Sequence, residues 1–358
     1  MKIVMDNIQI NAQSAIEDQL VQSATDLGNS TKTNIESLLK QSEELSKQLS
    51  DILTQIKNET ENSLGNEDDI IKVVDSLNQT RSSINDIIGV REMDVASSLS
   101  FMNLQVQQME NRVRELESRT LGSQIKDEVK SIVKNVVSSA RNAISETSKH
   151  LAEFFNKCRT SVENAISNIK QTSIDVSKAW SEYSKTANEY ANMVVDFKSE
   201  KTKEATQKKV DYINAEIDSK INDVENKYKN ATGLEKLAYK ATLIELKIDK
   251  NAIHNSEVNI ERISNIKEKA GQATDNIKQK VFDAKENISL YTDTAKNEIT
   301  KASKSVRESI VTKVISSLES AIDLAKNYAN DKGIKIPEPD KAKEMDQNKD
   351  QEPDIEME

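Results

Sequence analysis

Two histidines and one cysteine are the side chains of this sequence best suited to hold a metal ion. They are His150, His254 and Cys158. Cys158 follows His150 by eight residues, which places the two about 12 Å apart along a helix, too far to share one ion. No second histidine or cysteine stands at ligand spacing from His254. We therefore expect no metal site.

Acidic side chains are the other group that could do chemistry. The chain has 60 of them, interspersed with 50 basic side chains. On polar helices such carboxylates are solvated or paired with a lysine four residues away. General acid–base catalysis needs burial to shift a pKa, and only Arg81 and Arg91 fall on an apolar stripe, where we expect them to set helix register or to extend to water. Phosphate-binding glycine loops and nucleophile elbows are absent from the sequence. The sequence therefore predicts no catalytic residue, no cofactor and no enzyme.

The element that carries these residues is a stretch of 110 residues, 123–232, without glycine or proline. Apolar residues recur along it every eleven positions. Eleven residues make three turns at 3.67 residues per turn, close to the period of a straight α-helix. The row that starts at Ile125 continues as Val136, Thr147, Cys158, Ile169, Trp180 and Ala191. Because Cys158 and Trp180 lie in this row, we expect both to be packing residues.

The composition also favours helices. The chain has 358 residues, of which 7 are glycine and 3 are proline, and charged residues make up 31 %. Sheets need glycine and proline in their turns, and sustained periodicity argues against disorder. The predicted fold class is all-α, with long amphipathic helices forming an elongated helical hairpin or coiled-coil bundle.

Glycines and polar runs set the predicted boundaries in the first half of the chain. Residues 1–121 are expected to form three helices. The first should break at Gly28-Asn29-Ser30, and the second should end in a loop over Asn58–Asp69. Residues 123–230 are then expected to form one long helix, with a bend or fraying over Ser199–Lys209, which has no large apolar residue.

The second half is expected to return along the first. Thr232 and Glu235 have capping-box spacing, so the tip of the hairpin is predicted near Gly233. Residues 234–332 form the returning helix, and residues 333–358, which hold all three prolines and mostly acidic side chains, form a disordered tail.

The apolar seam of both arms is the predicted association surface. In the returning helix it consists of consecutive units of eleven residues, each beginning with isoleucine. The residues predicted to make this association stripe are Ile125, Val136, Leu151, Val162, Ile169, Trp180, Ile266, Ile277, Ile288, Ile299 and Ile310.

The pattern of residue types in these eleven-residue units resembles that of known repeat proteins. Segments such as KVFDAKEN, LYTDTAKNE and SKSVRES alternate small apolar residues with Lys and Glu. Over residues 266–331, and more loosely over 125–195, the pattern resembles the repeats of late-embryogenesis-abundant and perilipin-type proteins. That resemblance implies an amphipathic helix that lies on lipid or folds against a partner. The hairpin plan also looks like α-helical pore-forming toxins, whose hydrophobic insertion segment has its nearest counterpart in Tyr190–Phe197.

Two functions follow as expectations. The first is a non-enzymatic, elongated coiled-coil scaffold that associates with further copies or with another helical protein. The alternative is a protein that binds a lipid or membrane surface, including a secreted pore-forming toxin or translocator. With a net charge of −10 and no basic patch, we expect no nucleic-acid partner. No secretion signal or membrane-spanning run is recognisable, which predicts a cytoplasmic protein or export by a signal-independent route.

Overall fold

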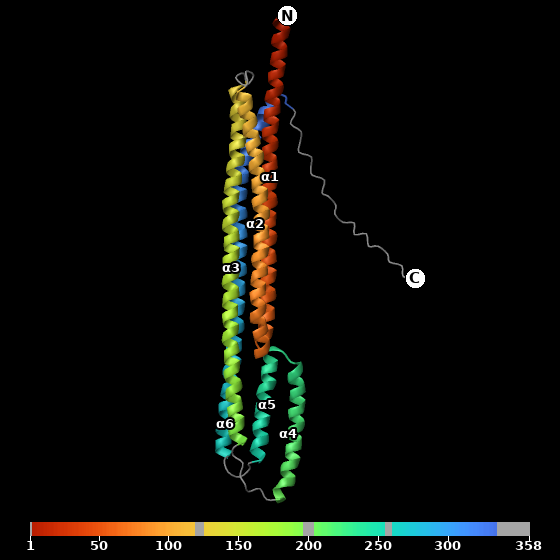
Figure 1. Cartoon of the computed structure of the whole chain (residues 1–358), viewed down its shortest axis with the longest axis vertical. Coiled ribbons are helices and arrows are strands. Elements are labelled where there is room, and N and C mark those ends of the chain that lie inside the picture. Colours follow the sequence, from red (N-terminus) through yellow and green to blue (C-terminus); the bar gives the residue numbers. More distant parts are fainter. Residues whose placement is uncertain (1, 119–124, 196–203, 255–259, 335–358) are drawn as a thin grey trace, which may run out of the picture. The chain divides into compact units, whose positions relative to one another are not determined.

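The chain folds into helices throughout the part that the computed structural model describes, residues 2–118, 125–195, 204–254 and 260–334 (Figure 1). The all-α prediction is confirmed. The helices are α1 (Lys2–Ser63), α2 (Glu67–Ser118), α3 (Asp127–Val195), α4 (Glu204–Asn230), α5 (Gly233–His254), α6 (Ile260–Ser309), a π-helix η2 (Ile310–Ile315) and α7 (Ser316–Asp331). None of the described helices has an apolar window long enough to cross a membrane.

The predicted break at Gly28 is wrong, because α1 runs through it without interruption. Gly28 does not have a positive φ. A Cβ atom placed there would lie 2.6 Å from Cγ1 of Ile322 in α7. The glycine therefore allows α1 and α7 to approach closely and does not make a turn. As a result residues 1–121 contain two described helices, α1 and α2, where three were expected.

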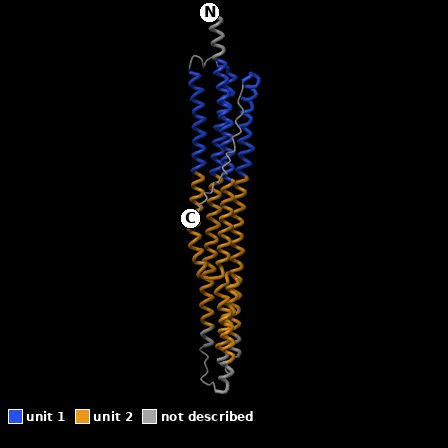
Figure 2. The backbone as a smooth tube through the Cα atoms, turned by 90° about the vertical axis from the view of Figure 1, so that its right-hand side faces the viewer, with its two compact units in different colours: residues 1–42, 93–152, 305–358 blue, residues 43–92, 153–304 orange. Residues whose placement is uncertain are grey.

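Residues of α1, α2 and α3 contribute to two compact units (Figure 2). Unit 1 comprises residues 1–42, 93–152 and 305–358. Ion pairs join its neighbouring helices: Lys32 in α1 pairs with Glu319 in α7, and Arg141 in α3 pairs with Glu110 in α2. The core of unit 1 consists of aliphatic side chains from all of these helices, among them Leu20, Val21, Ile35, Leu38, Met102, Val106, Val133, Val136, Ile310, Leu318 and Ile322.

Unit 2 comprises residues 43–92 and 153–304, and it holds all of α4 and α5. Its core contains the largest buried side chains, among them Leu49, Leu53, Ile70, Ile84, Phe154, Trp180, Ile277, Ile288 and Ile299. Helices α4 and α5 pack against each other as a short hairpin. Its tip is at Gly233, whose φ of +56° starts α5.

The hairpin tip therefore lies where it was expected. The described helices are α3 and α4 within the predicted arm 123–230, and α5, α6, η2 and α7 within the predicted arm 234–332. Helix α3 ends at Val195 and α4 begins at Glu204, while α5 ends at His254 and α6 begins at Ile260. Of the bend expected over Ser199–Lys209, residues 204–209 belong to α4. Residues 199–203 of that bend and residues 335–358 of the expected tail lie outside the described residues.

Candidate interaction surfaces

The predicted association stripe is buried inside the single chain. Its side chains are between 0 % and 6 % exposed, each within its own unit: Ile125, Val136, Leu151, Val162, Ile169, Trp180, Ile266, Ile277, Ile288, Ile299 and Ile310. Since burial of this kind stabilises the fold, these residues are already satisfied by their own chain. A surface that binds a second molecule has to be sought elsewhere.

Cys158 occupies the position of a small apolar core residue. Its side chain is fully buried in unit 2, and loss of solvation raises the pKa of the thiol to about 12. The thiol therefore stays neutral and unreactive. His150 lies 4.0 Å from Glu146 on the same face of α3, whereas the side chain of His254 lies outside the described ones. Among the described residues no group of three potential metal ligands comes together.

Arg81 extends from its stripe to the surface, which is one of the two roles expected for it, and binds a carboxylate there. Its Nε and Nη2 atoms donate to Glu163 of α3 over 3.1 and 2.7 Å. Asn85 donates to the same carboxylate over 3.2 Å. The hydrogen bond from Arg81 lowers the pKa of Glu163, and Asn85 adds to this effect. The pair orients α2 against α3 within unit 2.

Trp180 combines packing with a polar contact that the sequence did not reveal. Its indole N–H donates 2.9 Å to the main-chain oxygen of Leu64, just after α1 ends. Tyr183 packs edge-on against it with ring centroids 5.7 Å apart. Lys240 of α5 lies 4.7 Å from the centre of the Trp180 ring and donates 3.0 Å to Ser184. Burial lowers the pKa of Lys240. One aromatic residue thus joins the end of α1 to α5.

Two turns meet beside this cluster. A Cβ atom on Gly65, in the turn between α1 and α2, would overlap the backbone of Gly233, in the turn between α4 and α5. Asn66 donates 2.9 Å to Asp69, and this hydrogen bond lowers the pKa of the Asp69 carboxyl. The sequence marked both glycines as turn residues, but it carried no signal that the two turns touch.

The outward side of α2 in unit 1 is the surface that the sequence reading missed. Met93, Phe101 and Leu104 are 64 %, 56 % and 50 % exposed. They lie on the side of the helix opposite its buried residues, Leu99, Met102 and Val106. We call Met93, Ser97, Phe101 and Leu104 the outward α2 face.

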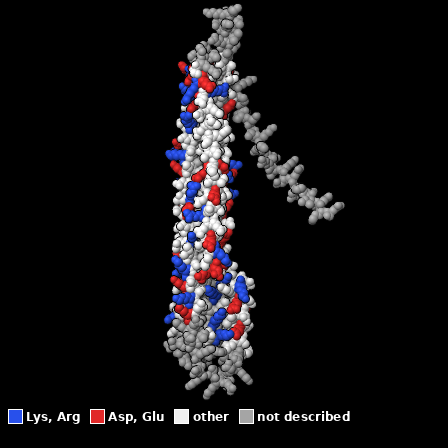
Figure 3. Space-filling model, in the orientation of Figure 1, with Lys and Arg blue, Asp and Glu red and all other residues white. Residues whose placement is uncertain are grey.

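Charged side chains are also absent from this part of α2. The fifteen residues from Val95 to Met109 include no Lys, Arg, Asp or Glu, in a chain that is 31 % charged. The space-filling view shows an uncharged stretch in the upper part of the visible face, with charged side chains around it (Figure 3). This local loss of charge is the signal in the sequence that could have located the surface.

Comparison with known proteins gives no relative for this chain: no protein-family model, no curated protein and no solved structure matches it. The surfaces themselves are therefore the basis for an inference about function.

Proposed function

We propose that the protein is a non-enzymatic structural protein that acts by helix–helix association, and that the outward α2 face binds the same face of a second copy. One observation carries this proposal: Met93, Phe101 and Leu104 are half exposed or more on a helix that also buries its inner side. A helix that is apolar on both sides is typically covered on both. In a single copy α2 is covered on one side.

The residues of the outward α2 face fit a second copy of themselves. In an antiparallel pair whose twofold axis crosses α2 at the level of Ser98 and Leu99, Phe101 of each copy lies opposite Ser97, and Leu104 lies beside Met93. Phe101 then packs against a small side chain, and Leu104 contacts Met93 at the edge of the interface. Packed helices fit ridges into grooves in this way. A twofold interface requires this self-complementarity. Between Val95 and Met109 no charged side chain has to lose its water in such a pair.

Substitution of the outward α2 face tests the proposal. Phe101→Asp with Leu104→Asp places two carboxylates on each side of the pair, so we expect the parent chain to dimerise and the variant to remain monomeric. Sedimentation equilibrium at loading concentrations of about 1–100 μM measures this difference. Both residues are exposed, and the helical circular dichroism signal should stay unchanged.

Phe282→Asp is the matched control, because Phe282 is an exposed aromatic residue on α6 in the other unit. It should dimerise as the parent does. A parent chain that stays monomeric over the whole range, or a double variant that dimerises equally well, would contradict the proposal. Flotation with phosphatidylcholine vesicles distinguishes the lipid alternative: if the parent floats and the double variant does not, the face binds lipid instead of a second copy.

A further inference from the structure

A groove between α2 and α3 in unit 1 offers a second surface, on a different side of α2 from the outward α2 face. It is open to solvent and has a volume of about 810 Å³. Its apolar lining consists of Leu99 and Ile144, which are nearly buried between the two helices, and of the exposed Ala152. Amide and hydroxyl side chains complete the walls, and they are Asn103, Gln107, Asn111, Ser145 and Ser148. A groove with apolar contacts and many hydrogen-bonding groups suits a short peptide segment.

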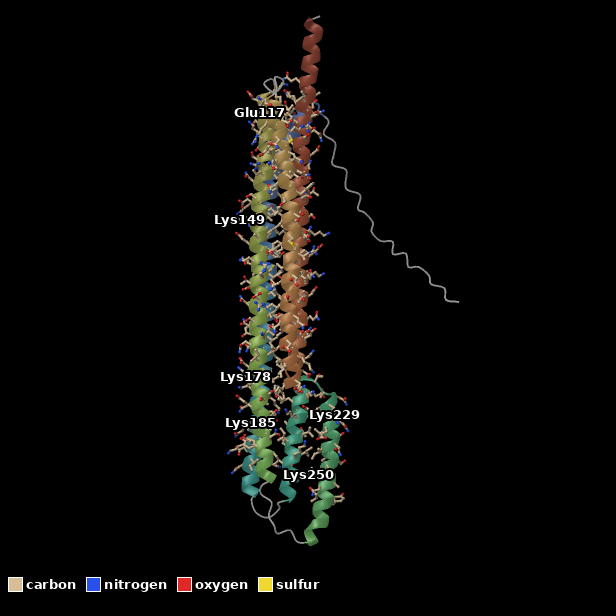
Figure 4. The ribbon with its side chains drawn as sticks, in the orientation of Figure 1. Glu117, Lys149, Lys178, Lys185, Lys229 and Lys250 are labelled. Carbon is tan, nitrogen blue, oxygen red and sulfur yellow. The ribbon has the colours of Figure 1, made fainter. Side chains whose placement is uncertain are left out.

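The charges in this groove are mostly positive. Of its four charged lining residues, Glu110 and Arg141 form an ion pair of 2.6 Å and neutralise each other. Arg114 and Lys149 are exposed and make no ion pair with any described residue. Figure 4 labels Lys149 on α3. Two positive charges therefore remain, and the groove fits an acidic segment that also has apolar side chains.

The sequence contains such a segment. Residues 350–358, DQEPDIEME, have five acidic residues and no basic one, together with Ile355 and Met357. Residues 335–349 hold four acidic and four basic residues, so the net charge of 335–358 comes entirely from this last part. No other stretch of nine residues in the chain combines five acidic residues with no basic one.

The connection is long enough. Helix α7 ends at Asp331 in unit 1, the unit that contains the groove. Fifteen residues lie between Ile334 and Asp350, and an extended chain of that length spans roughly 50 Å.

The end of α7 lies beside the start of α3, where burial raises the pKa of Tyr328 and Glu128 is close enough to add to this effect. The groove residues of α3, Arg141 to Ala152, lie about 20–36 Å from Glu128 along that helix. A segment tethered in this way has an effective concentration in the millimolar range, so modest affinity is sufficient.

We propose that the acidic segment 350–358 binds in the groove between α2 and α3 of its own chain, with its carboxylates beside Arg114 and Lys149 and its Ile355 and Met357 side chains on the apolar lining. The proposal is independent of dimerisation through the outward α2 face. It assigns this groove a specific occupant, which another acidic peptide would have to displace.

A spin label on the segment tests the contact. Gln351→Cys introduces a thiol without changing the charge, and the buried, unreactive Cys158 leaves it as the site of labelling. We expect the full-length labelled chain to give a slow component in its electron paramagnetic resonance spectrum. This component should be lost in Arg114→Glu with Lys149→Glu, and also in concentrated salt, which screens exposed charges.

Lys185→Glu is the control, because Lys185 is an exposed lysine of α3 outside the groove (Figure 4). It should leave the slow component unchanged. Reversal of the acidic partners, Asp354→Lys with Glu356→Lys, should restore the slow component in the groove variant. A label that is equally mobile in the parent and the groove variant would overturn the proposal, as would a slow component that grows with protein concentration, since that would place the segment in another copy.

Discussion

The apolar seam of α6 and the outward α2 face are both rows of large apolar side chains, but they have opposite environments. The α6 seam in unit 2 repeats every eleven residues, and Ile277, Ile288 and Ile299 are between 0 % and 2 % exposed. The outward α2 face in unit 1 is short, lies off the buried stripe of its helix and is exposed. In this protein the regular pattern describes how the chain packs against itself. The apolar residues that depart from the pattern are exposed, and they form the surface that we propose for association.

The largest expected effect is a loss of stability on substitution in the α6 seam, and its absence would contradict this comparison. Ile288→Asp places a carboxylate at a position that is 0 % exposed, which should lower the free energy of unfolding by about 4 kcal/mol or more. Urea unfolding followed by circular dichroism measures the change. Ile288→Val, with an expected loss of about 1 kcal/mol, remains measurable if the aspartate variant does not fold.

The control lies two residues along the same helix. Leu290 is 61 % exposed, so Leu290→Asp should change the unfolding free energy by no more than about 0.5 kcal/mol. If Ile288→Asp were as stable as Leu290→Asp, the α6 seam would not be a core.

Two glycines, one packed and one open, allow a similar comparison with smaller expected changes in stability. Gly65 faces the backbone of Gly233, so Gly65→Ala forces two turns apart and should cost about 1–3 kcal/mol. Gly89 lies inside α2 with nothing within 4 Å of its Cβ position. Gly89→Ala should therefore stabilise the protein by about 0.5–1 kcal/mol, the usual gain in a helix interior. Thermal unfolding of both variants gives the sign directly, and a destabilising Gly89→Ala would show that this position is not open.

The smallest effect concerns the exposed pair of Arg81 and Glu163. The lowered pKa of Glu163 means that its ionised form stabilises the folded state. That contribution is present at neutral pH and is lost as the pH falls below the ordinary value of 4.5 through the lowered pKa. Arg81→Met should lose less than about 1 kcal/mol at pH 7, because the pair is solvated. Urea midpoints of parent and variant should converge in acid, and a constant difference down to about pH 2.5 would contradict this assignment.

Much of the fold could be predicted from periodicity and glycine content. The eleven-residue rows identified the buried positions from Ile125 to Ile310, and capping-box spacing placed a turn at Gly233. The role of Gly28 could not be predicted, because a glycine that ends a helix and one that admits Ile322 look the same in a sequence.

The interaction surfaces were harder to find than the core. The association stripe was chosen by its regularity, and the structure places it inside the chain. Met93, Phe101 and Leu104 follow no long repeat, so only the missing charge around them distinguished them. The contact between Trp180 and the Leu64 carbonyl, and the groove beside Arg114, depend on residues brought together from distant parts of the sequence, for which a single sequence has no local signal.

The π-helix η2 has a consequence for how this chain tolerates insertions and deletions. The N–H of Ser316 donates to the carbonyl of Val311, five residues earlier, so one turn holds an additional residue. Loss of a residue between Ile310 and Ile315 would turn this segment into ordinary α-helix. The residues that follow would keep their orientation toward the core, because the change is confined to this turn. The same deletion within α6 would rotate every later seam residue by about 100° away from the core. Among the described helices, length is therefore least constrained at this one turn, where natural variants that differ by a single codon would be easiest to accommodate.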